Sequence, residues 1–542
     1  MSWRFFSQFL LAALVVLLSL PVLAVLASWL ELDRQGWALL AGMGSTVLPG
    51  YAMTSLILCL AVALGVTVLG AVTACAVALF DFPGRRVFEW ALLLPLAMPA
   101  YVVAFAYTDF LQFAGPLQSF LRAGLGLQGR LLPDVQSLWG AVLVFTVCLY
   151  PYVYLLVRTA LAERAVNLME AARLLGAPLR RRLLQVALPL ARPAIAAGVG
   201  LALMETLADF GASSYLGIQT FTTGIYKAWL ALDNRAVAAQ LATVLLFWVA
   251  ALLAIERTAQ HRLRFADSRG GVRSGAAESQ PVRLQGAQAV LAWLVCAGPI
   301  ALGFFLPVVF MMRPLVRGWG QWHWDSFLAW SFNSLWLAGL TAVLATALAV
   351  LLAFAARTQV RGVHRWASEL VGLGYAIPGA VIVVGLLLPL GWLQSLVPQW
   401  PLAGWLTTTS VGLVWAYLVR FLAVALQSVR SGYARIAASL DDSARMLGVS
   451  GRALLWRVHA PLLRRATAAA GLLVFVDVMK ELPATLVLRP FDSDTLAVVA
   501  YQMARDERLG EAALPALALV AVGLLPVLLI SRTLRAREEP RH

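Results

Sequence analysis

Four acidic residues and one lysine lie in two hydrophobic stretches of the chain, where an ionised side chain is costly. Glu205 precedes Asp209 by four residues, and Asp477 precedes Glu481 by the same interval. Residues four apart share one face of a helix, and a carboxylate in hydrocarbon needs protein, water or an ionic partner beside it. We therefore expect each pair to lie on one inward-facing side of its helix, with Lys480 able to pair with Asp477.

These five residues can be interpreted in two ways. Carboxylate oxygens are ligands that hard cations prefer, so the group is a candidate translocation path or gate. Alternatively, the carboxylates hydrogen-bond to neighbouring segments and hold the helices together. The sequence leaves both interpretations open and does not identify a metal. Tyrosines in other hydrophobic stretches also carry oxygen, but interfacial anchoring or helix packing explains them more simply: Tyr101, Tyr107, Tyr150, Tyr152 and Tyr154.

The elements that carry these residues are predicted from composition. The chain has 542 residues, of which 61% are hydrophobic and 13% are charged, and its mean hydropathy is +0.81. Soluble proteins carry roughly 25% charged residues, so we predict an all-α membrane protein. A spanning helix needs about 20 apolar residues, and about 12 transmembrane helices are expected: 9–30, 53–79, 88–109, 138–160, 193–215, 239–256, 288–312, 333–355, 368–390, 407–426, 466–486 and 513–531.

One offset of 272 residues aligns the two halves of the sequence, for example Glu205 with Asp477. Matches that stay in register over about seventy residues indicate a tandem duplication. We predict two homologous six-helix repeats, at 1–256 and 288–542, joined by a cytoplasmic linker at 257–287. A duplicated membrane protein usually forms a pathway between its halves.

The basic residues follow the predicted topology. The net charge is +15, and with the N-terminus inside, the cytoplasmic segments hold roughly three times as many Lys and Arg as the external loops. This positive-inside pattern predicts two cytoplasmic termini, with a lipid bilayer and no nucleic acid as partner. The four cysteines form no close pair for a disulfide or a metal. The first apolar run reaches about Leu30, so we expect an uncleaved span there.

Two long cytoplasmic loops, at 161–192 and 427–465, carry the same motif. In each loop we expect a short helix that stops at a glycine, because glycine adopts the left-handed conformation that ends a helix. A second short helix should follow, and the proline of the motif should end the unit. The motif residues are Glu170, Ala171, Ala172, Arg173, Gly176 and Pro189 in the first loop, and Asp442, Ser443, Ala444, Arg445, Gly448 and Pro461 in the second.

The composition of these loops suits contact with a partner protein. Small residues give each turn a low profile that can enter a groove, and the acidic residues lie beside Arg173 and Arg445, which could orient a docked complex. The alternative is an amphipathic loop that rests on lipid head groups. Two matched loops at equivalent positions favour docking.

The loop motif resembles the coupling motif of permease subunits in binding-protein-dependent ABC importers. In that family, which has the type I importer permease fold, the loop inserts into a cleft on a cytoplasmic ATPase. The resemblance implies two copies of an ABC ATPase subunit, a periplasmic substrate-binding protein and a place in the bacterial inner membrane. The second loop has Asp442 and Ser443 where the family has Glu and Ala. This conservative change is compatible with docking, but it makes the two docking loops non-identical.

Other segments are similar to ferric-iron permeases of this family, as is the fusion of two repeats in one chain. These segments are Leu94–Tyr107, Glu205–Gly211, Gln219–Tyr226, Lys480–Thr485 and Leu488–Phe491. The resemblance covers nearly the whole chain. It implies import of ferric iron from periplasm to cytoplasm by alternating access.

The chain has no recognisable P-loop of its own. That motif ends in Gly-Lys-Ser/Thr, whereas the two lysines, Lys227 and Lys480, are followed by Ala228 and Glu481. We therefore expect no enzyme activity from this chain alone and no cofactor bound by it. ATP would be used by the partner ATPase.

Two alternatives remain open from sequence. The first keeps the same machine but changes the cargo to thiamine, sulfate or a polyamine, because permeases for these cargoes share the loop motif. The second is a twelve-helix secondary transporter driven by an ion gradient, which intramembrane carboxylates would suit. The matched loops speak against the second alternative.

Overall fold

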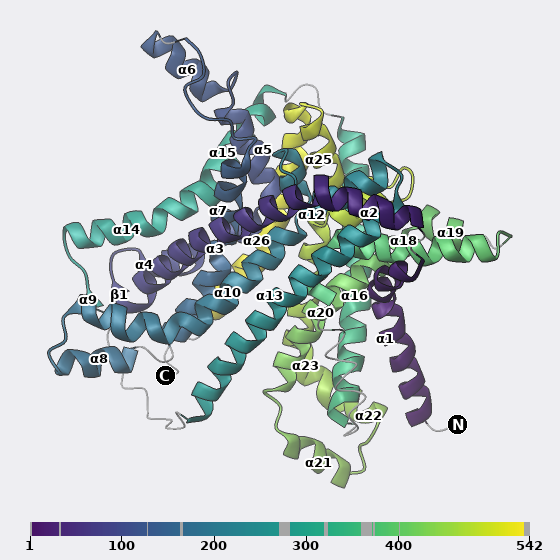
Figure 1. The fold of residues 1–542 in the computed structure, drawn as a ribbon. Helices are drawn as coiled ribbons and strands as arrows, with labels where there is room; N and C mark the ends of the chain where they lie inside the picture. The colour runs from purple at the N-terminus through teal and green to yellow at the C-terminus, as the bar shows by residue number, and fades with distance from the viewer. Residues whose placement is uncertain are drawn as a thin grey trace. The chain divides into compact units, whose positions relative to one another are not determined.

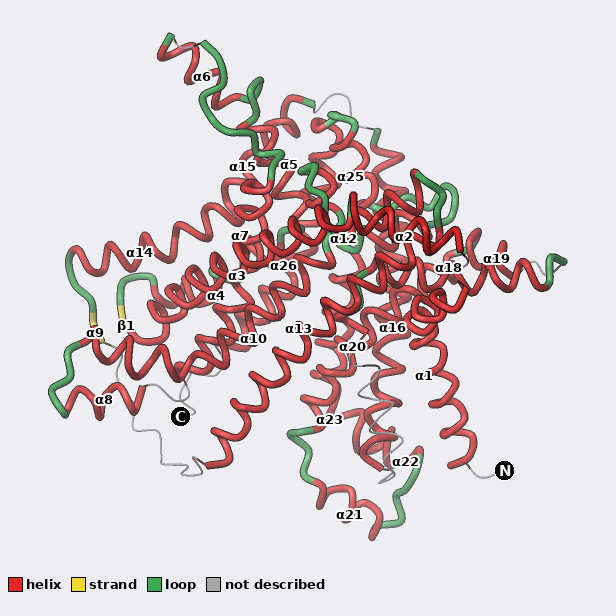
Figure 2. The backbone as a smooth tube through the Cα atoms, viewed as in Figure 1, coloured by secondary structure: helices red, strands yellow, loops and turns green. Residues whose placement is uncertain are grey.

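The computed structural model describes residues 3–31, 34–126, 128–162, 166–269, 282–318, 323–358, 371, 374–399 and 402–535. Almost all of these residues are helical, as the red segments of Figure 2 show. The strands in this part of the chain are two residues long, β1 (Phe80–Asp81) and β2 (Val282–Arg283), and they pair in parallel. The predicted all-α fold class is confirmed.

Figure 1 shows the helices coloured in chain order. Those of the first half are α1 (Trp3–Ala27), η1 (Ser28–Glu31), α2 (Arg34–Thr46), α3 (Leu48–Leu79), α4 (Arg85–Ala91), η2 (Leu94–Ala97), α5 (Ala100–Leu111), α6 (Pro116–Leu125), α7 (Leu138–Ala160), α8 (Val166–Leu174), α9 (Leu179–Arg182), η4 (Leu183–Ala187), α10 (Leu188–Ala208), α11 (Gly211–Tyr215), α12 (Phe221–Tyr226), η5 (Lys227–Ala231) and α13 (Arg235–Arg269). Those of the second half are α14 (Ala287–Ile300), η6 (Ala301–Phe305), α15 (Leu306–Arg317), α16 (Trp324–Thr358), η8 (Gly374–Ala376), α18 (Gly379–Leu396), α19 (Leu402–Thr408), α20 (Ser410–Tyr433), α21 (Ala438–Met446), α22 (Arg452–Leu454), η9 (Leu455–His459), α23 (Ala460–Met479), α24 (Pro483–Leu488), α25 (Leu496–Arg505) and α26 (Leu509–Arg535).

Nine helices in the described part of the chain are long and apolar enough to cross a membrane, and a tenth span is possible if one bent pair is counted. The bent pair, Arg85–Ala97 with Ala100–Leu125, turns by 87° at the predicted third span. The predicted eleventh span corresponds to α23, which carries Arg464, Arg465 and Asp477 and does not count among the nine. The structure therefore supports a multi-pass membrane protein without confirming twelve spans.

Contacts divide the chain into two compact units, and the first unit is built around the second half of the sequence. It comprises Met1–Gly42, Gly224–Leu246 and His323–Val499. In this unit α16, α20 and α23 pack together, and α1 lies along α18. Figure 1 shows the purple α1 beside these green helices, although they are far apart in the sequence.

A proline in α1 explains part of this long-range packing. Pro21 has no N–H, so it leaves the carbonyl oxygen of Leu17 without its helical donor. The indole Nε1 of Trp415, on α20, donates to this oxygen at 3.1 Å. At Gly385, on α18, a side chain would collide with the carbonyl oxygen of Pro21. Glycine at this position therefore lets α1 and α18 approach closely.

The second unit comprises Met43–Thr223, Phe247–Trp322 and Ala500–His542. Its centre is α3 packed on α7 and α10, and α5 packs on α15. The Tyr107 hydroxyl on α5 donates to the Leu302 carbonyl oxygen at 2.6 Å, and the rings of Phe110 and Phe310 stack with centroids 3.8 Å apart. The last long helix, α26, covers η2, α4 and α15.

The compact units and the sequence repeats have different boundaries. The duplication is visible in the helices, because α20, α21 and α23 each begin 272 residues after α7, α8 and α10. Each unit nevertheless combines the core of one repeat with end helices of the other. The predicted linker, 257–287, begins inside α13, and residues 270–281 lie outside the described part of the chain.

Candidate coupling loops and intramembrane carboxylates

The first motif loop ends its short helix as the sequence predicts. α8 stops before Gly176, whose φ is 78°. The Gly176 amide donates to the Arg173 carbonyl oxygen at 2.9 Å, and the Ala177 amide donates to the Ala172 carbonyl oxygen at 3.0 Å. These two bonds form a Schellman motif, which satisfies carbonyl groups that the helix end would leave unpaired.

The second motif loop has the same terminus. Gly448 has a φ of 80° and donates to the Arg445 carbonyl oxygen at 3.0 Å, while the Val449 amide donates to the Ala444 carbonyl oxygen at 2.9 Å. A Cβ at Gly176 or Gly448 would meet no atom within 4 Å. The backbone conformation, and not crowding, therefore requires glycine at both positions.

The expectation that Pro189 and Pro461 end the motif units is wrong. Residues Leu179–Ala208 form one helix, and Pro189 lies near the start of its α10 part. Pro461 has the same place in α23. Each proline follows a π turn, η4 or η9, where the hydrogen bonding shifts by one residue. The helix can thus continue past a residue that supplies no N–H.

Each motif helix presents a pair of large apolar side chains just before its glycine. Leu174 and Leu175 are 85% and 88% exposed, and the matched Met446 and Leu447 are 88% and 83% exposed. Exposed apolar groups that recur at equivalent sites indicate an interaction surface. We call the two segments 166–178 and 438–451 the coupling loops; they are shorter than the predicted loops, 161–192 and 427–465, because residues 179–192 and 452–465 belong to helices.

The motif residues divide between an outward and an inward side. Most of them are exposed: Glu170, Ala171, Arg173 and Gly176 in the first loop, and Asp442, Ser443, Arg445 and Gly448 in the second. Ala444 is buried and Ala172 is half-buried. In the second loop Arg445 pairs with Asp442 at 3.1 Å, so the predicted acidic and basic neighbours do meet there.

The intramembrane carboxylates are arranged differently from the expectation. α10 ends at Ala208, so Asp209 lies at its C-cap and not on a helical face with Glu205. Its Oδ1 accepts hydrogen bonds from the amides of Ala212, at 2.9 Å, and Ser213, at 3.1 Å. The carboxylate therefore caps the first turn of α11.

Glu481 performs the same task in the second repeat. α23 ends at Met479, and the two carboxylate oxygens of Glu481 accept from the amides of Ala484, at 2.9 Å, and Thr485, at 3.0 Å. In each repeat the long helix therefore ends just before a carboxylate, and that carboxylate caps the short helix that follows. The prediction of one shared helical face is wrong at Asp209 and Glu481, because each follows the helix end.

Glu481 also belongs to a buried polar group that the sequence did not predict. Its Oε1 lies 3.3 Å from Arg420 Nη1, and the two side chains are 1% and 11% exposed. Thr485 Oγ1 donates to Glu481 Oε2 at 2.7 Å and lies 2.7 Å from the hydroxyl of Tyr417. The first repeat has Cys148 at the position that matches Arg420.

The remaining path candidates stay within or beside the long helices. Glu205 lies in α10 and Asp477 in α23, both half-buried, and Lys480 is the C-cap residue of α23. Their use in a translocation path stays a prediction. In the described part of the chain, no three His, Cys, Asp or Glu side chains are grouped so that they could hold a metal ion.

Three of the five tyrosines confirm the packing interpretation. Besides Tyr107, the buried Tyr150 donates to the Leu92 carbonyl oxygen at 3.0 Å, and the buried Tyr154 donates to the Glu89 carbonyl oxygen at 2.9 Å. These hydroxyls tie α7 to the segment around α4 and η2.

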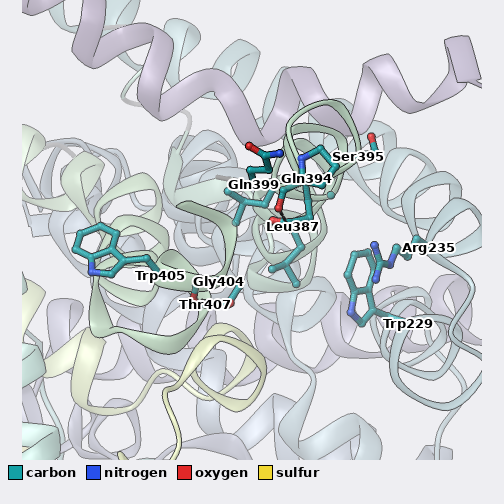
Figure 3. Close-up of a pocket in the computed structure, with 12 residues that line it drawn as sticks. Trp229, Arg235, Leu387, Gln394, Ser395, Gln399, Gly404, Trp405 and Thr407 are labelled. Carbon is teal, nitrogen blue, oxygen red and sulfur yellow. Dashed lines mark hydrogen bonds between the residues drawn. The ribbon is translucent and has the colours of Figure 1, made fainter. Parts of the chain in front are cut away.

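A large pocket opens in the first compact unit, at the end of α18. It has a volume of about 1100 Å³, and Figure 3 shows Trp405 on one side and Trp229 with Arg235 on the other. Gln394, Ser395 and Gln399 also line it (Figure 3). The Arg235 guanidinium lies 5.8 Å from the centroid of the Trp229 ring. Aromatic faces, amides and a guanidinium suit contact with polar or anionic groups.

Sequence reasoning also missed the residues beneath the second coupling loop. Asp441 is buried and bonded to Arg357 and His459. The signal was present in the repeat alignment, where Asp441 stands opposite Met169. A carboxylate that replaces an apolar residue at a matched position indicates a local partner.

Comparisons with known proteins agree with this architecture. The model of the family "Binding-protein-dependent transport system inner membrane component" matches residues 66–255. The chain is 26% identical over 485 residues to the Fe(3+)-transport system permease protein FbpB 2 of Haemophilus influenzae, a match that covers 88% of both chains. It is 23% identical to the ferric transport system permease protein FbpB of Actinobacillus pleuropneumoniae, over 77% of this chain and 61% of that protein.

The chain is also similar to another permease over a shorter stretch. It is 33% identical over 132 residues to the molybdenum transport system permease protein ModB of Escherichia coli, which covers 24% of this chain and 56% of that protein. Together these findings define the class: residues 66–255 match the binding-protein-dependent transport family, and the chain as a whole is similar to ABC-type permeases and is a multi-pass protein of the inner membrane. Within this class, the two relatives named above that align along most of the chain are ferric-transport permeases.

Proposed function

We propose that this chain is the translocation subunit of an ATP-driven importer that moves ferric iron from the periplasm to the cytoplasm by alternating access. The observation that carries the proposal is the matched pair of coupling loops. Each loop presents a short helix, a left-handed glycine and two exposed apolar residues at positions 272 residues apart. One loop for each of two ATPase subunits is the arrangement that a duplicated permease requires.

The coupling loops fit a protein partner better than a lipid surface. Burying one Leu or Met side chain contributes about 1.5–3 kcal/mol, so the pair Leu174–Leu175 or Met446–Leu447 can anchor a loop in a groove. The charged side chains of the motif lie beside these anchors on the same short helix. We propose two copies of a cytoplasmic ABC ATPase as the partners, with ATP bound by them.

We propose an orientation of the chain from the coupling loops. If the coupling loops face the cytoplasm, both termini do as well, and the pocket lined by Trp229, Arg235 and Trp405 opens toward the periplasm. A periplasmic substrate-binding protein would dock on that side. The polar and aromatic residues that line the pocket suit contact with the surface of another protein.

Ferric iron is the cargo named for two of the relatives that match most of the chain. The match to a molybdenum permease shows that related chains serve other cargoes. Thiamine, sulfate and polyamines therefore stay alternatives, to be decided by the ligand of the binding protein. A secondary transporter is the less favoured alternative, because it gives no role to two matched docking loops.

The test is uptake of radioactive ferric iron into proteoliposomes that contain the chain, its ATPase and its binding protein. We expect ATP-dependent uptake by the complete system and none by the chain alone. Uptake by the chain alone under a proton gradient would overturn the proposal. Saturation of the binding protein by another cargo, and not by ferric iron, would overturn the cargo assignment only.

The double variant Gly176→Asp and Gly448→Asp tests the coupling loops directly. Each aspartate must adopt a left-handed φ, which costs about 1 kcal/mol per residue, and it places a charge beside the apolar anchors. We expect normal insertion in the membrane but loss of ATPase binding and uptake. Gly126→Asp is the matched control, because Gly126 also has a positive φ, 63°, and open space around it. Normal uptake by the double variant would remove the coupling role.

A further inference from the structure

The second coupling helix, α21, is tied to the spanning helices by four buried or mostly buried side chains. We call these residues the α21 anchor: Arg357 at the end of α16, Tyr433 at the end of α20, Asp441 on α21, and His459 at the end of η9. His459 is fully buried, and the side chains of Asp441 and Arg357 are 8% and 16% exposed. In Figure 1, α21 lies beyond the lower ends of α16 and α23.

Arg357 holds both the start of α21 and the end of α20. Its Nε lies 2.6 Å from Asp441 Oδ2, and its Nη2 lies 3.3 Å from Asp441 Oδ1. The same guanidinium donates to the carbonyl oxygens of Tyr433, at 3.2 Å, Ile436, at 3.1 Å, and Ala437, at 3.1 Å. One side chain of α16 therefore fixes the whole connection from α20 to α21.

His459 completes the α21 anchor by contacting both Asp441 and Tyr433. Its Nε2 lies 3.0 Å from Asp441 Oδ1, and its Nδ1 lies 3.3 Å from the Tyr433 hydroxyl. The ring also packs edge-on against Tyr433 and Phe354, with centroids 5.3 and 5.5 Å away. Hydrogen bonds are directional, so α21 cannot tilt without breaking contacts to three other elements.

The first repeat has apolar residues at three of the four matched positions, and Arg85 stands opposite Arg357. Met169, Leu161 and Ala187 stand opposite Asp441, Tyr433 and His459, and they are 6%, 0% and 0% exposed. Apolar contacts have no preferred direction, and a methionine side chain adapts to changes in its surroundings. The first coupling helix therefore rests on apolar contacts at these three positions, which permit small rotations. We call these contacts the apolar seat.

We propose that the α21 anchor makes the second coupling loop move as one body with α16 and α23, so that Arg357, Asp441 and His459 are positioning residues for coupling. This inference rests on the proposed function, since it describes how ATPase movement reaches the spanning helices. The two coupling loops are then mechanically unequal. The second transmits displacement through fixed bonds, and the first adjusts in its apolar seat.

The mechanical part can be tested without the ATPase. Spin labels at Leu351→Cys on α16 and Met446→Cys on α21 occupy exposed positions, at 45% and 88% exposure. In lipid nanodiscs we expect one narrow distance distribution for this pair and a broader one after Asp441→Asn. An unchanged width after Asp441→Asn would overturn the inference, whether or not the proposed function holds.

The coupling part is tested in the reconstituted complex by measuring both ATPase affinity and cargo imported per ATP hydrolysed. Asp441→Asn should leave ATPase affinity unchanged and lower the import per ATP roughly tenfold, within the range found for linked sites. Asp134→Asn, which removes a carboxylate from the exposed Arg130–Asp134 pair, is the control and should change neither quantity. Unchanged import per ATP after Asp441→Asn would overturn the inference. A wild-type chain that binds no ATPase would overturn the proposed function instead.

A graft separates positioning from simple packing. The triple variant Tyr433→Leu, Asp441→Met and His459→Ala installs the apolar seat of the first repeat under α21. Arg357 keeps its hydrogen bonds to the carbonyl oxygens of residues 433, 436 and 437, so we expect the variant to fold, which thermal unfolding in detergent checks. We expect it to bind the ATPase, but to show a broad distance distribution and low import per ATP. Wild-type coupling by the graft would show that an apolar seat is sufficient and would overturn the inference.

Discussion

At the scale of single residues, the matched carboxylates Asp209 and Glu481 act as helix caps. Each accepts two backbone hydrogen bonds from the short helix that follows it. A negative charge is favourable at a helix N-terminus because it faces the positive end of the helix dipole. Glu481 is also paired with the buried Arg420, so the loss of this cap also breaks a buried ion pair.

This difference predicts unequal effects of neutral substitutions. Glu481→Gln removes the negative partner of a buried arginine, which should lower the free energy of unfolding by about 3–5 kcal/mol. Asp209→Asn keeps an acceptor oxygen, so the loss should be below about 1 kcal/mol. Thermal unfolding in detergent measures both. Equal losses, or a larger loss for Asp209→Asn, would contradict the assignment of Glu481 to a buried ion pair.

At the scale of elements, the two coupling helices end alike but rest on different surfaces. Both stop at a left-handed glycine in a Schellman motif. The local sequence around each glycine decides this terminus, and both repeats share the pattern Ala-Arg-x-Leu-Gly there. The support beneath each helix comes from other elements, and there the charged α21 anchor replaces the apolar residues of the first repeat.

The charge on Asp441 predicts a pH dependence for α21. Burial would raise the pKa of Asp441, but hydrogen bonds and charge from Arg357 and His459 outweigh this and hold the pKa below its ordinary value. Because the pKa is lowered, the ionised carboxylate stabilises the α21 anchor fully at every pH above the ordinary aspartate pKa of about 3.9. This stabilisation is lost as the pH falls through the lowered pKa that Asp441 has in the folded protein.

The spin-label pair at Leu351 and Met446 measures this dependence. We expect a narrow distance distribution above pH about 4 and a broader one at lower pH. Asp441→Asn should be broad throughout this range, and tryptophan fluorescence should monitor global unfolding. A distribution that broadens equally with pH in both proteins would show that another group is responsible.

At the scale of the whole molecule, the repeats exchange helices. α1 of the first repeat packs on α18 of the second, while α15 and α26 of the second repeat pack within the unit built on the first. Neither half of the sequence therefore contains all the partners of its own helices. The exchange makes each compact unit depend on both halves of the chain.

A chain cut within the segment between the repeats tests this dependence. Residues 1–275 and 276–542, expressed separately, should each accumulate poorly because α1, α15 and α26 lose their packing surfaces. When expressed together, a tag on one half should retain the other through purification, since the exchanged helices still bury apolar area. Two halves that are stable alone and do not associate would contradict the exchange.

The sequence by itself determined the features that depend on composition and local order. Hydrophobic stretches predicted the membrane class, the 272-residue offset predicted the duplicated helices, and Gly176 and Gly448 predicted the helix ends. These follow because span length, repeat register and a left-handed turn are encoded within short segments.

Only the tertiary structure decided where the polar side chains find partners. Asp209 and Glu481 leave their helices to cap the next turn. Asp441 meets Arg357 from 84 residues away. The exchange of α1 likewise depends on the Leu17 carbonyl and Trp415, which are 398 residues apart. Such pairings arise from how distant helices pack, and helical periodicity contains no information about which distant helix will be the neighbour.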